Sequence, residues 1–204
     1  TFRRFNRKQD YLEFLSYSLD AKEVRTIFTE REDAYINLHD NFYQLNDGEH
    51  FLWTSEQTGF NQLYLYHFDG SLVRQLTSGE NPLGSIVRVD QKISLVYYTA
   101  YHNMGLDEYF HVVSFDGEST QLSESDGRYT ISMNEAAEYY VSRSSSFDRP
   151  YAASMHKADG SLIRSLQKMN VDQVIEQAER TMSRSSASRL RHKSLLGSPG
   201  PISH

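Results

Sequence analysis

A recurring phrase limits the fold of this chain more than any other feature. An Asp-Gly pair stands in three similar stretches, HFDGSLVRQLT (67–77), SFDGESTQLSE (114–124) and KADGSLIRSLQ (157–167), whose Asp residues are 47 and 43 positions apart. A weaker first copy places Asp20 another 49 residues upstream. A second phrase, which begins near Asp47, Asp90 and Asn134, keeps the same period. A period of this length is typical of repeat architectures.

The text within each repeat is typical of short β-strands. Runs such as HFLWTS, LYLYHF and SLVYYT are rich in Tyr, Phe, Val and Trp, and clusters of Gly, Asp, Asn or Ser separate them. Asp-Gly between two such runs indicates a tight hairpin, because both residues accept positive φ. Four short strands per repeat favour a β-propeller blade over the alternative, an all-β sandwich of irregular hairpins.

We therefore predict an all-β fold, a partial β-propeller of about three and a half four-stranded blades with a short C-terminal helix and a flexible tail. The propeller is predicted for residues 1–167. Its parts are the end of one blade and three further blades, at 1–30, 40–79, 81–124 and 127–167.

The sequence changes character after Gln167. A short amphipathic helix is predicted for 168–182, because apolar residues follow Asn170 at helical spacing, namely Val171, Val174, Ile175 and Ala178. Gln173 is placed for a capping box. Residues 183–204 are rich in Ser and Arg and have no periodicity, which predicts a flexible basic tail.

Composition and charge exclude several classes of function. The net charge is −6, and the tail holds four basic residues and no acid, so residues 1–182 carry −10 and would repel nucleic-acid phosphates. No stretch approaches 18 apolar residues, so no membrane span is predicted. The absence of Cys excludes a disulfide scaffold and a thiol nucleophile. The opening TFRRFNRKQD lacks Met and a targeting segment, so we expect residue 1 to lie inside a longer protein.

Motifs of known chemistry are missing. Among the 11 glycines no two are four positions apart, so the chain has no Gly-x-Ser-x-Gly nucleophile elbow. The eight His residues show no metal-binding spacing, and surface or hydrogen-bonded histidines are expected. The run 142–146 is expected to be a strand end and loop. We assign no catalytic, cofactor-binding or metal-binding residues and no cofactor, and the substrate-binding residues stay unassigned.

Whole phrases of this chain resemble the N-terminal β-propeller of the dipeptidyl peptidase IV family of serine exopeptidases. The matching text lies at 4–20, 34–80, 96–118 and 139–167. The most specific phrase is W-T-S-E-x-x-G-F-x-x-L-Y-L-Y, which begins at Trp53. From its residues alone this phrase is a strand, a turn at Gly59 and a second strand, with Trp53, Leu63 and Leu65 as core candidates and Glu56 where the hairpin leaves the sheet.

The resemblance implies an eight-bladed propeller that caps an α/β-hydrolase domain with a Ser-Asp-His triad, which removes dipeptides, or in some relatives tripeptides, after Pro or Ala. In that family a pair of propeller glutamates holds the free amine of the substrate. That pair lies upstream of the text matched here, so the adjacent acids Asp107 and Glu108 do not inherit its role, and a solvated pair is expected. His39 lies in an inter-blade loop and is assigned no role.

We therefore expect the substrate-gating and scaffold portion of such an exopeptidase, inactive by itself, with the hydrolase domain of the parent protein and small peptides as partners. The resemblance implies a periplasmic or extracytoplasmic location. The alternative is a non-catalytic interaction propeller of the Tol or WD-repeat kind. A third possibility is that the sequence after residue 167 is foreign or frame-altered. Open blade faces, apolar as the strands LYLYHF and EYYVSR suggest, predict self-association.

Removal of residues 183–204 should leave the β-structure and the melting temperature nearly unchanged, because a segment without apolar periodicity buries little area. Circular dichroism and thermal melts of the two chain lengths make the comparison. A drop of more than a few degrees on truncation would contradict the prediction.

Overall fold

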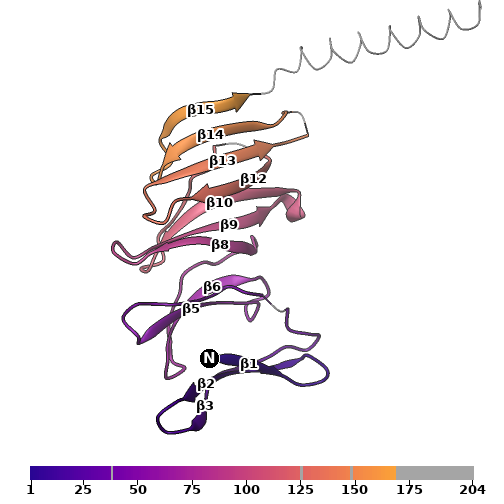
Figure 1. Ribbon diagram of the computed structural model, residues 1–204. Coiled ribbons are helices and arrows are strands. Elements are labelled where there is room, and N and C mark those ends of the chain that lie inside the picture. Colours follow the sequence, from indigo (N-terminus) through magenta and orange to yellow (C-terminus); the bar gives the residue numbers. More distant parts are fainter. Residues whose placement is uncertain (38, 125, 148, 169–204) are drawn as a thin grey trace, which may run out of the picture. The chain divides into compact units, whose positions relative to one another are not determined.

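The computed structural model describes residues 1–168, apart from residues 38, 125 and 148 (Figure 1). Residues Thr1–Gln167 form one compact unit, and the chain divides after Gln167. The described part is all-β except for one helical turn, η1 (Asn103–Gly105). The helix predicted from 168 to 182 and the tail predicted from 183 to 204 fall, beyond Lys168, outside the described residues.

The first two sheets are antiparallel meanders. The first sheet contains β1 (Phe2–Phe5), β2 (Tyr11–Ser18) and β3 (Glu23–Arg31), in the order β1-β2-β3. The second sheet contains β4 (Phe42–Gln44), β5 (His50–Ser55), β6 (Gln62–His67) and β7 (Leu72–Gln75), again in chain order.

The third sheet has eight strands in two halves. The first half is β8 (Leu83–Asp90), β9 (Leu95–His102), β10 (Asp107–Ser114) and β11 (Ser119–Gln121). The second half is β12 (Arg128–Met133), β13 (Tyr139–Ser145), β14 (Ala152–Lys157) and β15 (Leu162–Lys168). One parallel pair, Glu108 with Arg128, joins β10 to β12. The stretches predicted as separate blades at 81–124 and 127–167 therefore form one continuous sheet.

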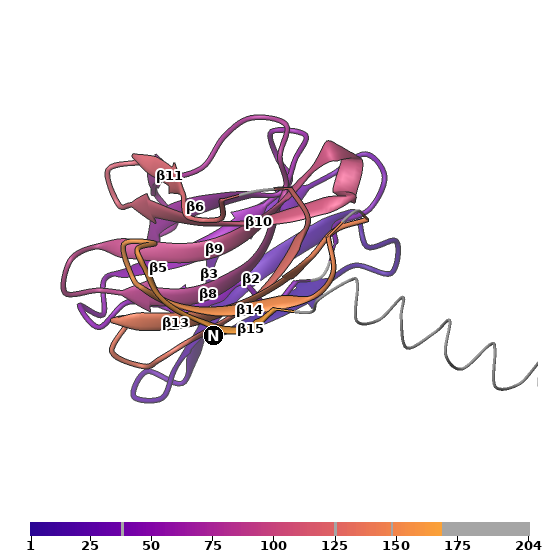
Figure 2. The ribbon, with the colours of Figure 1, turned by 90° about the horizontal axis from the view of Figure 1, so that it is seen from above.

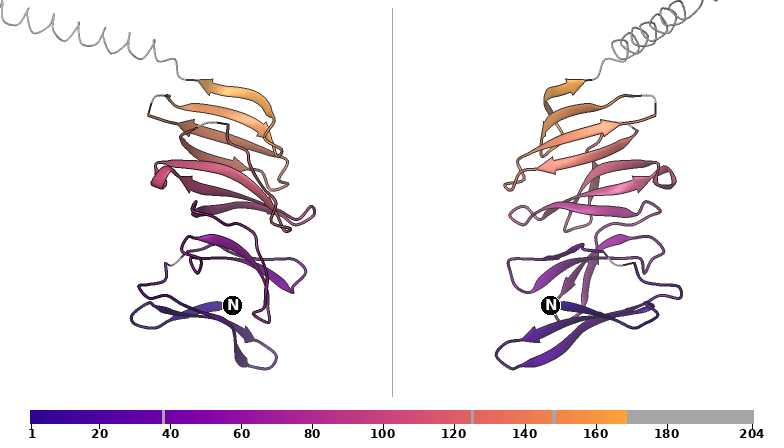
Figure 3. Two further views of the ribbon diagram at one scale, coloured as in Figure 1. Left: turned by 180° about the vertical axis from the view of Figure 1, so that it is seen from behind. Right: turned by 45° about the vertical axis from the view of Figure 1, so that its right-hand side comes forward.

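Within this unit the sheets follow one another in chain order (Figures 1 and 3), and they overlap when the unit is seen from above (Figure 2). Hydrogen bonds between neighbouring repeats keep the strands in phase. Each of three such bonds links residues 45 positions apart, namely Ile86 to Asn41, Asn46 to Gln91 and Arg88 to Met133. The period seen in the sequence is therefore the distance along the chain between equivalent strands.

Side chains fill the space between successive sheets in three interfaces. The first interface, between the first and second sheets, is aromatic: Phe14 lies 5.0 Å from Trp53 and 5.4 Å from Phe51, measured between ring centroids. The second interface, between the second sheet and β8–β11, is mainly aliphatic. The third interface, between β8–β11 and β12–β15, has a smaller buried core of Tyr97, Phe110, Ala137 and Tyr140.

The predicted core residues of the family-specific phrase are confirmed. Trp53, Leu63 and Leu65 are 1%, 0% and 6% exposed. Along β6, Tyr64 and Tyr66 enter the first interface, whereas Leu63 and Leu65 enter the second. The strand LYLYHF therefore lies between two covered faces and does not mark an open end of the described unit.

The Asp-Gly turns hold the sheets close together. Gly70, in the turn between β6 and β7, has φ +93°, and a Cβ atom there would lie 1.9 Å from the carbonyl oxygen of Ile27 in β3. Asp69 shapes this turn, since its Oδ1 accepts a hydrogen bond of 2.8 Å from the Ser71 amide. Glycine is required at position 70 by the close approach and by the positive φ together.

Substitution Gly70→Ala should destabilise the fold by about 1–3 kcal/mol more than Gly48→Ala, because only the former forces a side chain into a neighbouring strand. Gly48 is the matched control, since it also has positive φ, +71°, but has no atom within 4 Å of the added Cβ. Urea unfolding of both variants gives the free energies of unfolding. Equal losses for the two substitutions would contradict the assigned contact.

Candidate functional site

Three groups of polar side chains lie in or beside the interfaces between sheets, around Glu30, His111 and His156. A group of this kind can serve as a binding site only where it borders a cavity that admits a ligand. Two further hollows, of about 540 and 550 Å³, are bordered chiefly by side chains at strand ends and turns, and their lining includes no buried polar side chain.

The first group is centred on Glu30 of β3. The indole Nε1 of Trp53 donates a hydrogen bond of 3.0 Å to Glu30 Oε1. Burial raises the pKa of Glu30, and the charges of Glu32 and Glu56 raise it further against hydrogen bonds that lower it. Glu56 accepts bonds of 2.9 Å from the side-chain amide of Asn37 on both carboxylate oxygens.

His39 completes this group and shows why it is closed. Its ring lies edge-on to Trp53, with 5.0 Å between ring centroids, and burial lowers its pKa. The cavity bordered by Glu30, His39 and Glu56 measures only about 10 Å³. That space holds about one water molecule, which is too small for a ligand. His39 and Glu30 are therefore part of the packed interface and do not form a binding site.

The second group is a pair of histidines across β9 and β10. His102 Nε2 and His111 Nε2 lie 3.2 Å apart, and the rings of Tyr109 and Tyr98 stack against them. Burial lowers the pKa of His111 to about 4, and the neighbouring His102 contributes to this shift. Burial also lowers the pKa of His102. At neutral pH both rings are therefore neutral, and one donates a hydrogen bond to the other.

The adjacent acids Asp107 and Glu108 differ from the solvated pair that we expected. Glu108 forms an ion pair of 3.3 Å with Arg128, and its side chain is 18% exposed. Asp107 accepts a hydrogen bond from the side-chain amide of Asn103. The two carboxylates thus have separate partners. They lie at the junction of the two halves of the third sheet, where β12 pairs with the part of β10 that β11 leaves free.

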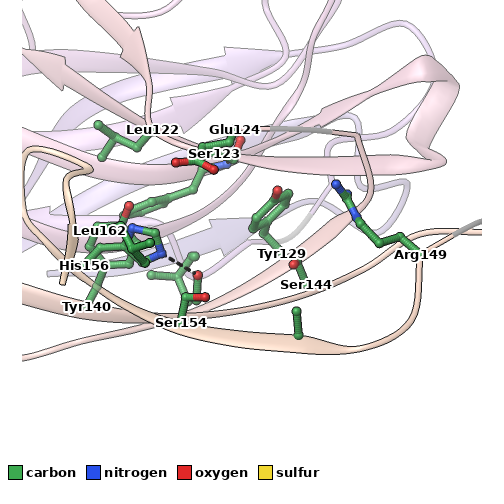
Figure 4. A pocket seen from close by; sticks show the side chains of 14 residues that line it. Leu122, Ser123, Glu124, Tyr129, Tyr140, Ser144, Arg149, Ser154, His156 and Leu162 are labelled. Carbon is green, nitrogen blue, oxygen red and sulfur yellow. Dashed lines mark hydrogen bonds between the residues drawn. The ribbon is translucent and has the colours of Figure 1, made fainter. Parts of the chain in front are cut away.

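The third group borders a cavity of about 190 Å³ in the third interface (Figure 4). Its floor consists of Phe110 and Tyr140, whose rings meet edge-to-face at 4.8 Å. Hydroxyl side chains line its walls from β13 and β14, namely Ser142, Ser144 and Ser154. Glu124 and Arg149 stand among the lining residues on two connecting loops.

His156 fixes the hydrogen bonding in this cavity. Its Nδ1 lies 3.1 Å from the carbonyl oxygen of Gly160, and its Nε2 lies 3.2 Å from Ser142 Oγ. A carbonyl oxygen only accepts, so Nδ1 carries a hydrogen, and in the tautomer protonated at Nδ1 alone the Ser142 hydroxyl donates to Nε2. The ring stacks on Tyr140 at 4.9 Å, and both His156 and Ser142 are 8% exposed.

This serine–histidine contact does not form a catalytic unit. Acyl transfer requires hydrogen-bond donors aimed at a developing oxyanion. Ser142 lies in the middle of β13, paired with Ile131 on one side and with Ser154 on the other, so the backbone around it is engaged in the sheet. The arrangement is a rigid polar pocket suited to binding.

Sequence reasoning did not identify this pocket. The run 142–146 was expected to be a strand end and loop, and β13 does end at Ser145. The available signal was the repeat itself, because aligned copies of the strands carry aromatic residues where this one carries serine. None of the described residues forms a group of three or more potential metal ligands. Among the described segments, no helix has the length and apolarity needed to cross a bilayer.

Antiparallel sheets that repeat in phase, with glycine turns docked on the preceding sheet, define a β-propeller-like domain. The family model described as the dipeptidyl peptidase IV N-terminal region matches residues 1–151. The chain therefore belongs to the dipeptidyl peptidase IV N-terminal family.

Similar proteins agree with this assignment. A probable dipeptidyl peptidase 4 of Arthroderma benhamiae is 31% identical over 148 residues, and human dipeptidyl peptidase 8 is 27% identical over 171 residues. These matches cover 69% and 68% of this chain but only 19% of each relative. The crystal structure of Porphyromonas gingivalis dipeptidyl peptidase 4 has the same fold, with a TM-score of 0.73 at 22% identity over 81% of this chain and 24% of that one.

Lowering the pH should destabilise the protein through His111. Its folded pKa of about 4 lies below the ordinary value of about 6.5, so the unfolded chain binds the extra proton first, and stability falls as pH drops from about 6.5 to about 4. Because the ring is partly solvated, we expect a loss of about 1–2 kcal/mol. Urea unfolding at the two ends of this window should show a smaller loss for His111→Gln than for the native chain. An unchanged pH dependence in the variant would contradict this assignment.

Proposed function

We propose that residues 1–167 are the substrate-gating and scaffold portion of a dipeptidyl-peptidase-IV-like serine exopeptidase, and that the hydrolase domain of the parent protein carries the reaction. The observation that supports this proposal most is the family match over residues 1–151. The regular arrangement of the sheets, with equivalent strands in register, also supports this proposal, since a gating propeller must hold its loops in fixed positions around a passage.

In this proposal the unit is the C-terminal half of the propeller, about three and a half blades. The first sheet is the incomplete blade, the second sheet is the next, and the two halves of the third sheet are the last two. Residues 168–182 and 183–204 form the proposed helix and tail. Self-association through open blade faces stays a prediction. The exposed face of β12 is polar or charged, which is unfavourable for association through apolar contacts; its residues are Arg128, Thr130 and Ser132.

One edge of the stack offers a surface for the proposed partner domain. In a meander, the turns that follow every second strand lie at the same edge, and here these turns present exposed apolar side chains. Phe60 is 39% exposed after β5, and Met104 and Phe147 are fully exposed after β9 and β13. Exposed apolar groups along one edge are typical of an interaction surface.

The rival function, a non-catalytic interaction propeller of the Tol or WD-repeat kind, makes a different prediction about the parent gene. A Gly-x-Ser-x-Gly motif encoded downstream of residue 167 favours the peptidase, whereas further repeats favour the rival. The same reading frame decides whether the sequence after residue 167 is native.

The chain by itself should not hydrolyse chromogenic Xaa-Pro or Xaa-Ala amides, whereas the full-length parent should. The reason is that the described strands supply neither an activated nucleophile nor oxyanion donors. Release of the leaving group is measured for both proteins after identical purification. Turnover that follows the isolated chain through a column would contradict the proposal.

The edge surface is tested in the full-length parent. The double substitution Met104→Asp and Phe147→Asp should lower hydrolysis and loosen the domain contact. Ile93→Asp is the matched control, since Ile93 is 61% exposed at the opposite edge, in the turn between β8 and β9. Equal activity of both variants would argue against this edge as the contact with the hydrolase.

A further inference from the structure

The in-phase repeat allows one position to be compared in three successive four-stranded units. In each unit the first residue after the third strand donates its backbone N–H to the carbonyl oxygen of the residue that precedes the second strand. These bonds are Phe68 to Glu49, Phe115 to Ser94, and Ala158 to Glu138. With this alignment, one cross-strand pair that faces the preceding unit reads Trp53–Tyr64, then Tyr98–His111, then Ser142–Ser154.

The cavity in the third interface follows from this series. In the first interface Trp53 and Tyr64 fill the corresponding space, and each is 1% exposed. Ser142 and Ser154 are far smaller, and no neighbouring side chain compensates for the missing volume, so about 190 Å³ stays open. This volume exceeds the roughly 10–15 Å³ that one water molecule needs, but lies below the roughly 300 Å³ of a drug-sized pocket.

Hydroxyl side chains from two neighbouring strands line the walls of the cavity. Ser144 and Ser154 line it, and within the described part of the chain their hydroxyls have no hydrogen-bond partner. Ser142 donates to His156 and keeps its lone pairs available. Hydroxyl groups both donate and accept, so these walls match a ligand whose own groups do the same.

Charge at the cavity does not select an ion. The two charged lining residues, Glu124 and Arg149, have opposite signs, and the Arg149 guanidinium also donates to the backbone oxygen of Asp126. Two largely buried aromatic residues, Phe110 and Tyr140, also border the cavity. Aromatic faces pack well against the C–H groups of a compact ligand.

We propose that the cavity of the third interface binds a small neutral polyol, in the size range from glycerol to a monosaccharide. This binding site is independent of the peptidase function, because it rests on the serine pair, the hydroxyl-lined walls and the cavity volume. The ligand would pack on Tyr140 and exchange hydrogen bonds with Ser144 and Ser154. For so few contacting atoms, the expected dissociation constant is about millimolar.

The first test titrates the full chain with D-glucose, D-galactose and glycerol, and with acetate and methylammonium as ionic comparators, using protein-observed NMR. Saturable shifts of residues at the cavity by at least one polyol, without saturation by either ion, are the expected result. Absence of saturation by all three polyols would show that the cavity holds water only. Tighter binding of an ion would overturn the proposed ligand class.

The second test fills the cavity. The double variant Ser142→Trp, Ser154→Tyr recreates the pair of the second sheet and should weaken polyol binding at least tenfold. The matched control is Ser132→Trp, since Ser132 is exposed and alternates with Ile131, which lines the cavity. Should the double variant not fold, Ser144→Ala and Ser154→Ala each remove one hydroxyl and should weaken binding about threefold to tenfold. Unchanged binding in the folded variants would overturn the proposal.

Discussion

The distance between the first and second sheets is set where the backbone of the Asp-Gly turn between β6 and β7 approaches the backbone of β3. At Gly70 the approach is so close that the Ile27 carbonyl occupies the place where a Cβ atom would stand. The equivalent glycines of the next two repeats approach less closely. A Cβ atom at Gly117 would lie 3.8 Å from the carbonyl oxygens of Gln75 and Leu76, and one at Gly160 would lie 3.3 Å from the Leu122 side chain. The side chains of the first interface pack within the gap that this turn fixes, and turns with the same internal hydrogen bond recur in the next two repeats.

Because the gap is fixed, each interface has to fill it with the side chains that its own strands supply. The first interface uses aromatic rings such as Phe14 and Trp53, and the second uses leucines and valines. The third has smaller residues at the same positions and leaves space. Polar side chains therefore lie in the repeat whose strands carry serine where the other repeats carry aromatic residues. As a result, a buried histidine and several serines border one cavity.

The sequence predicted the periodic parts well. The repeat led to all-β units whose core includes Trp53, Leu63 and Leu65, because alternation and turn residues act over short distances. The continuous pairing through Glu108 and Arg128 was missed, because it depends on where β11 stops. The cavity was missed for a related reason: a serine in a strand is ordinary by itself and becomes informative only beside its equivalents in other sheets.

The single parallel pair between Glu108 and Arg128 also distinguishes how the units are coupled. The first and second sheets touch the rest of the stack through side chains and isolated hydrogen bonds, whereas β8 to β15 belong to one sheet whose two halves are joined by the single pair Glu108–Arg128. Cooperative units in proteins often coincide with contiguous supersecondary groups. The last two repeats would therefore open and close as one body in native-state hydrogen exchange, and a ligand bound between them would protect amides in both.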